Sequence, residues 1–233
     1  MIERRPFATL GAFHNEWLNA KHHFSFGHYR DPARAGFGRL LVWNDDEISS
    51  GAGFDPHPHR DMEIITYIRD GAITHRDNLG NEGRTEAGDV QVMHAGTGLV
   101  HAEYNREKIL TRLFQIWILP DRAGVKPGWE AKKFPRAGAG LAVVASGREQ
   151  DAGTGALPLY ADAAVLAGTL PAGQAVEYVL APGRALYLVP ARGAVTVNDV
   201  AVGTRDGAAI TDEKALRIVP TEETELVMVE VAA

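Results

Sequence analysis

Cysteine is absent from this chain of 233 residues. Disulfides, thiolate nucleophiles and zinc–thiolate sites are therefore excluded together, and a bound metal must be held by nitrogen and oxygen atoms. The chain also has no apolar run close to the roughly 18 residues that a membrane span needs. Its charged first residues are not followed by the apolar stretch of a signal peptide. We expect a cytoplasmic protein that makes no membrane contact.

Positive charge is also scarce. The 24 Lys and Arg residues face 30 Asp and Glu residues, which gives a net charge of −6, and the only basic doublets, Arg4-Arg5 and Lys132-Lys133, stand far apart. Direct binding to nucleic acid is therefore not expected. Apolar residues make up 45% and charged residues 23% of the chain, which is the composition of a folded globular protein rather than of a disordered one.

Long helical periodicity is missing as well. The chain consists mainly of short β-type runs separated by Gly, Asp, Asn and Pro. The clearest runs cover residues 63–69, 89–93, 110–119, 185–189 and 225–231. Helix is expected only in short pieces, near residues 123–129 and 162–167. The pattern predicts an all-β fold closed into barrels, because closure leaves no strand edge exposed.

A weak internal repeat indicates two such barrels. The Gly-Ala-Ile-Thr of residues 71–74 returns as Gly-Ala-Val-Thr at 193–196, and a glycine stands twenty residues before each copy. In this frame His57 of the first copy corresponds to Val179 of the second. A chance echo is the alternative, but matched glycine spacings favour a repeat. We place the boundary near residue 134, which gives an N-terminal barrel at 1–134 and a C-terminal barrel at 135–233.

All nine histidines fall within the first 101 residues, so we expect the chemistry in the first barrel. His57 and His59 are two residues apart, and side chains at that spacing on a strand point to the same face. His101 and Glu103 repeat the spacing after a glycine-rich turn. Two such strands facing each other would bring three imidazoles and one carboxylate together, a set that suits iron, copper, nickel, manganese or zinc. The alternative is four polar side chains that face solvent.

Two stretches resemble the motifs of the cupin superfamily. The first motif has a glycine, a His-x-His pair, a glutamate and a second glycine, and the chain matches it with Gly51, His57, His59, Glu63 and Gly71. Its last gap is one residue longer than usual. The second motif is matched at residues 88–90 and 98–101, without its usual proline. Glu63 is therefore a second candidate for the carboxylate ligand.

Residues 23–26, 53–63, 88–93 and 95–103 together resemble the pirin family. The resemblance implies a bicupin, with two jelly-roll-type cupin barrels in one chain. It implies that the N-terminal barrel binds one divalent metal ion, and that the C-terminal barrel has lost its ligands, as Val179 and Ala181 at the repeated positions suggest. Iron is the expected metal, and copper, nickel, manganese and zinc are alternatives. The implied ligands are His57, His59, His101 and Glu103.

Other side chains are assigned around this centre. Glu63 is expected beside the metal ligands or as a base. Phe24 and Phe26 are expected in the core or the pocket wall, and His94, which stands where pirins usually have a small hydroxyl residue, is a further candidate for the substrate pocket. His75 has no spacing that argues for ligation, and we expect it to be an ordinary hydrogen-bonded or exposed histidine, like His14 and His28.

The resemblance implies an oxidoreductase of the quercetin 2,3-dioxygenase type, which opens a flavonol ring with O2 and releases carbon monoxide. Glu103 or Glu63 would accept the proton of the substrate hydroxyl. The alternative is a non-enzymatic, iron-dependent redox sensor that regulates protein partners. A third reading is a closed zinc site with a purely structural role. A monomer is expected.

Overall fold

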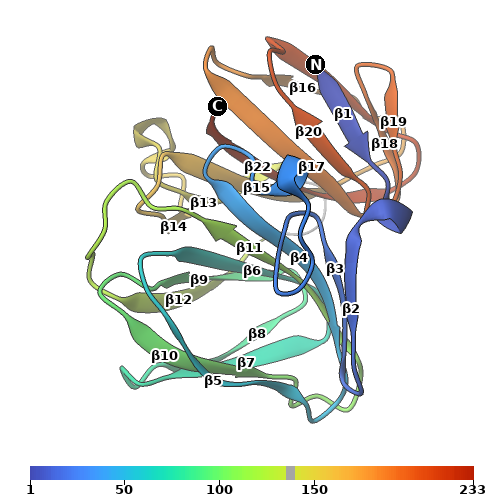
Figure 1. Cartoon of the computed structure of the whole chain (residues 1–233). Coiled ribbons are helices and arrows are strands. Elements are labelled where there is room, and N and C mark those ends of the chain that lie inside the picture. The colour runs from blue at the N-terminus through green and yellow to red at the C-terminus, as the bar shows by residue number, and fades with distance from the viewer. Residues whose placement is uncertain (135–139) are drawn as a thin grey trace.

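The computed structural model describes residues 1–134 and 140–233. It is built almost entirely of antiparallel strands arranged in two large and two small sheets (Figure 1). The boundary expected near residue 134 adjoins residues 135–139, which lie outside the described part, so the division into 1–134 and 135–233 stays a prediction.

The N-terminal half contains one large and one small sheet. In spatial order the large sheet consists of β12 (Gly128–Lys133), β9 (Asp89–His94), β6 (Glu63–Asp70), β11 (Thr111–Ile118), β4 (Leu40–Ile48), β3 (Leu18–His22) and β2 (Gly11–His14). The small sheet consists of β5 (Gly53–His59), β10 (Leu99–Tyr104), β7 (Ala72–Asp77) and β8 (Glu82–Glu86). The two sheets enclose the first barrel (Figure 1).

The C-terminal half repeats this order. Its large sheet consists of β1 (Ile2–Arg5), β20 (Gly207–Ile210), β17 (Arg184–Arg192), β22 (Thr224–Ala232), β15 (Ala163–Leu170), β13 (Ala142–Ser146) and β14 (Leu157–Pro158). Its small sheet consists of β16 (Val176–Val179), β21 (Ala215–Pro220), β18 (Val195–Val197) and β19 (Val200–Val202). The first strand of the chain pairs with β20 as β12 pairs with β9, so the outer strand of the C-terminal large sheet comes from the opposite end of the chain.

The two large sheets pack against each other and bury both of their faces. On β6, Ile65 and Tyr67 enter a central core shared with β15, β17 and β22, whereas Ile64 and Ile68 point into the first barrel. Successive residues of a strand face opposite sides of the sheet. A strand that is buried on both sides therefore has a continuous run of apolar residues in its sequence. This explains the unbroken apolar stretches of the sequence and confirms the expected all-β fold.

The two expected helices are wrong. Residues 163–170 form β15, in which Ala163 and Val165 enter the central core while Ala164 and Leu166 enter the second barrel. Residues 123–127 are irregular, and β12 begins at Gly128. The helices of the described residues are three short 3-10 turns at Phe7–Thr9, Pro32–Arg34 and Glu149–Asp151. None of them is long and apolar enough to cross a membrane.

The repeated glycines occupy matching turns. Gly71 has φ 72° and Gly193 has φ 70°, a region that residues with a Cβ atom rarely adopt. A Cβ would lie 2.8 Å from the hydroxyl of Thr111 at the first position and 2.5 Å from that of Thr224 at the second. Each glycine thus packs its turn onto the first residue of the neighbouring long strand. The repeat read from the sequence is a structural one.

Candidate metal centre

Two neighbouring strands bring the three expected imidazoles together. In the antiparallel β5–β10 pair, His101 lies opposite His57 and Leu99 lies opposite His59. The ring centroids are 4.5 Å apart for His57 and His101, 4.8 Å for His57 and His59, and 5.0 Å for His59 and His101. One ring nitrogen from each residue lies within 4.8 Å of the others. These atoms are close enough to share one ion.

Hydrogen bonds leave nitrogen lone pairs free for that ion. Nδ1 of His57 lies 2.7 Å from the carbonyl oxygen of Asp55, so it must donate and its Nε2 keeps a lone pair. Nε2 of His101 is buried and has no hydrogen-bond partner in the described structure. A buried polar atom without a partner is costly, and a metal would satisfy it. The donor set therefore fits a divalent metal.

Two of the three histidines, His59 and His101, are held in the neutral form that a metal requires. Burial, helped by His57, lowers the pKa of His59 to about 4. Burial also lowers the pKa of His101 to about 2, and the charges of the neighbouring histidines act in the same direction. Near neutral pH both rings are unprotonated and can donate a lone pair.

Glu103 lies next to this trio but belongs to a second, overlapping group. One of its carboxylate oxygens lies within 4.8 Å of nitrogens of both His75 and His101. The side chain is almost fully buried and accepts hydrogen bonds from Nε2 of Gln91 at 2.6 Å and from Nε2 of Gln115 at 2.9 Å. Burial raises the pKa of Glu103 to about 7, although these amides act in the opposite direction. Its carboxyl can therefore exchange a proton near neutral pH.

His75 is the residue that sequence reasoning missed. It lies on β7 opposite Glu103 of β10, and its Nδ1 is 3.4 Å from Nδ1 of His101. Its Nε2 is 3.1 Å from a carboxylate oxygen of Asp77, and its ring stacks on Trp129 with an interplanar angle of 8°. The i, i+2 spacing of His75 and Asp77 was the available signal, because it puts both on one face of a strand.

Glu63 and His94 lie elsewhere and must be reassigned. The Glu63 carboxylate is 2.6 Å from Nδ1 of His94 and 3.1 Å from the backbone nitrogen of Tyr160, and it is part of neither metal-capable group. The ring of His94 packs edge-on against Tyr160. Both residues are on neighbouring strands of the large sheet, where they contact the C-terminal half. Their expected roles as base and pocket wall do not match these positions.

The two phenylalanines divide between core and pocket. Phe24 is fully buried in the central core against Tyr187, so of its two expected places, core and pocket wall, it occupies the core. Phe26 contacts Trp117 edge-on and lines the cavity in front of the histidines. This cavity has a volume of about 440 Å³. It is lined by Trp17, Phe26, Gly53, Phe54, Asp55, His57, His59, Glu103, Gln115 and Trp117.

Two barrels of matching strand order, with a histidine cluster in the first, define a bicupin with a candidate metal centre. The family model described as Pirin matches residues 4–118, and the model described as Quercetinase C-terminal cupin domain matches residues 143–231. This chain belongs to the pirin family, as its sequence motifs indicated.

Individual relatives agree with this assignment. A pirin-like protein of Caulobacter vibrioides is 55% identical over 234 residues, which cover 100% of both chains. The quercetin 2,3-dioxygenase of Escherichia coli K12 is 38% identical over 98% of this chain and 97% of its own length. The crystal structure of the bacterial pirin YhhW of Escherichia coli, in complex with nickel(II), has a TM-score of 0.94 and 37% identity, covering 100% of this chain and 99% of that one.

Proposed function

We propose that this pirin is a dioxygenase that cleaves a flavonol or a similar polyphenol at one metal ion held by His57, His59, His101 and Glu103. The observation that carries the proposal is the convergence of three imidazoles, one with an unpartnered buried nitrogen, at the wall of an aromatic-lined cavity. The relatives named quercetin 2,3-dioxygenase support the choice of reaction. Iron is the proposed metal, with nickel, copper, manganese and zinc as alternatives.

A divalent metal bound there would supply Lewis acidity, which lowers the pKa of a flavonol hydroxyl. Glu103 would accept the released proton, because its carboxylate lies beside His101 and lines the cavity that would receive the substrate hydroxyl. Gln91 and Gln115 hold its carboxylate in place through their amide groups. The buried rings of His75 and His101 keep the ligand side of the site rigid.

The cavity walls suit a planar aromatic substrate. Trp17 and Phe54 meet edge-on with centroids 5.2 Å apart, and Phe26 and Trp117 do so at 5.4 Å. Such rings bury a flat ligand and exclude water, which strengthens every electrostatic interaction inside. In the proposed reaction both atoms of O2 enter the ring-opened product and one ring carbon leaves as carbon monoxide. The reaction therefore needs no external reductant.

The test is aerobic quercetin consumption with simultaneous measurement of O2 uptake and carbon monoxide release by protein loaded with each metal in turn. His57→Ala and His101→Ala should abolish all three signals, because each removes a ligand. His14→Ala is the matched control, since His14 is exposed on β2 and outside both metal-capable groups. Wild-type protein that binds metal but never consumes a flavonol would overturn the proposal.

A further inference from the structure

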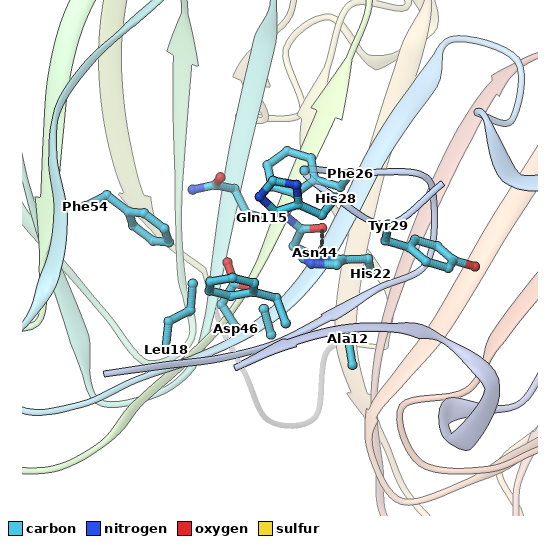
Figure 2. A pocket seen from close by; sticks show the side chains of 13 residues that line it. Ala12, Leu18, His22, Phe26, His28, Tyr29, Asn44, Asp46, Phe54 and Gln115 are labelled. Carbon is cyan, nitrogen blue, oxygen red and sulfur yellow. Dashed lines mark hydrogen bonds between the residues drawn. The ribbon is translucent and has the colours of Figure 1, made fainter. Parts of the chain in front are cut away.

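A second cavity opens beside the first, inside the N-terminal barrel. It has a volume of about 220 Å³ and lies between β2, β3, β4 and the turn at residues 26–29. Figure 2 shows Phe54 and Gln115 on one side of it and His22, Asn44 and Tyr29 on the other. The proposed metal centre does not use this space.

The two cavities share a wall. Phe26, Phe54 and Gln115 line both of them, and Gln115 also holds Glu103 through its amide at 2.9 Å. A ligand seated against the histidines would therefore have the second cavity directly behind these three side chains. A ring that extends from such a ligand has this space to enter.

Asp46 on β4 is the unusual group of the second cavity. Its side chain lines the cavity and is only 2% exposed, and its Oδ1 atom has no hydrogen-bond partner in the described structure (Figure 2). Leaving a buried polar atom unpaired is costly, so such an atom points to a missing partner. Burial, reinforced by Asp45 and Glu103, raises the pKa of Asp46 well above its usual range. A neutral carboxyl both donates and accepts a hydrogen bond, as a phenol does.

The size of the cavity limits what can fill it. An apolar cavity of roughly 150 Å³ holds one benzene molecule. At about 220 Å³ the second cavity has room for one ring with its hydroxyl groups, and not for a whole flavonol. Leu18, Ala20 and Phe26 supply an apolar surface for the ring faces, and Asp46 supplies the polar contact.

We propose that this cavity is a second compartment of the ligand site, which receives one hydroxylated aromatic ring of a polyphenol and hydrogen-bonds its hydroxyl through Asp46. The inference rests on the proposed function and adds the substrate class to it. Polyphenols with a hydroxylated pendant ring are the favoured ligands, and analogues without those hydroxyls bind less well. Asp46 is a positioning and selectivity residue.

The test measures binding without turnover. Nickel-loaded protein is titrated anaerobically with quercetin and with the analogue that lacks the pendant-ring hydroxyls. Asp46→Leu should weaken quercetin binding about tenfold, as expected for one buried hydrogen bond, and leave the analogue within about twofold. Asp46→Asn keeps a donor and an acceptor, so it should stay within about threefold for both ligands.

A second variant probes the space itself. Ala20→Leu should fill part of the cavity and weaken quercetin at least tenfold, because Ala20 lines the cavity on the same strand face as Asp46. Ala201→Leu on β19 of the other barrel is the control for an added leucine side chain and should change nothing. Thermal melting must show that each variant is folded.

The outcomes separate this inference from the proposed function. Equal quercetin affinity in wild type, Asp46→Leu and Ala20→Leu, together with loss of turnover in His57→Ala, would overturn the compartment and leave the dioxygenase supported. If the wild-type protein bound no flavonol, the proposed dioxygenase function would be rejected. The compartment would then be tested by titration with catechol. Catechol binding that is lost in Asp46→Leu and Ala20→Leu would support the compartment, and no catechol binding would overturn it too.

Discussion

The two barrels differ in how they accommodate buried polar and charged side chains. In the first barrel, Nε2 of His101 is buried without a partner, and burial raises the pKa of Glu103 to about 7. In the second barrel, Val179 and Ala181 occupy the positions that correspond to His57 and His59, and they line a cavity of about 700 Å³. The first barrel keeps the geometry of a ligand site, and the second has lost the imidazoles.

Charge in the second barrel is paired internally. Glu230 is 2.8 Å from Arg148 and 2.8 Å from Arg184, and it also accepts a hydrogen bond from Tyr178. Burial acts to raise the pKa of Glu230, but the hydrogen bonds from Tyr178 and Arg148 outweigh it and lower that pKa. Within residues 140–233 and β1, the one buried side-chain nitrogen or oxygen without a hydrogen-bond partner is Nη1 of Arg5 on β1. Unsatisfied groups thus concentrate in the half with the proposed chemistry.

The sharpest test of this contrast removes a ligand from the first barrel. His101→Ala should lower metal affinity more than a hundredfold, since even indirect partners of a metal ligand are typically worth 10- to 100-fold. Metal at about 100 times its dissociation constant should stabilise the wild type by about 2.7 kcal/mol, and the variant should not show this gain. Calorimetric titration and thermal melting with and without chelator measure both effects. An unchanged affinity would remove His101 from the ligand set.

In the second barrel, loss of a buried charge should lower the unfolding free energy and leave metal affinity unchanged. Glu230→Ala leaves Arg148 and Arg184, both mostly buried, without their shared carboxylate, and should cost about 3–5 kcal/mol of unfolding free energy. Metal binding should be unchanged. Glu177→Ala is the control, because the exposed pair of Glu177 and Arg217 should contribute well under 1 kcal/mol. Urea denaturation would contradict the contrast if the two variants were equally stable.

The two buried glutamates should differ in their dependence on pH. In metal-free protein the folded pKa of Glu103 is near 7 and its unfolded value near 4.5, so folding loses stability as pH rises through this window. A shift of one pKa unit corresponds to about 1.4 kcal/mol. Between pH 5 and pH 8 the unfolding free energy of Glu103→Gln should therefore rise by about 3 kcal/mol relative to that of the wild type.

Glu230→Gln provides the comparison. The lowered pKa of Glu230 stabilises the wild type above the unfolded value, and that advantage should be lost only as pH falls below it. Unfolding curves recorded at several pH values measure both slopes. Parallel slopes for the two glutamine variants would refute the opposite shifts.

The smallest expected effect concerns the overlooked histidine. His75→Phe keeps the stacking on Trp129 and removes the contact with Nδ1 of His101, so metal affinity should fall about tenfold while the fold persists. Val197 is the corresponding position of the second barrel, and Val197→Ala there should leave metal affinity unchanged. Competition with a chromophoric chelator resolves a tenfold change. Full affinity in His75→Phe would make His75 a packing residue only.

By itself, the sequence determined the family, the all-β fold, the repeat and the positions of the paired candidate ligands. These are local properties: spacing by two puts His57 and His59 on one strand face, and a positive φ demands Gly71 and Gly193. Continuous apolar runs located strands such as β6 and β22 within one or two residues.

Only the tertiary structure decided which side chains share a space. His75 meets His101 through the β7–β10 register, Glu63 turns to His94 and Tyr160, and Phe24 enters the core between the barrels. The alanine-rich β15 was misread as helix because alanine is a strong helix former, and because burial of both strand faces left no alternation to contradict that propensity. Each of these features depends on contacts between residues that are far apart in the chain, and a local sequence pattern does not predict such contacts.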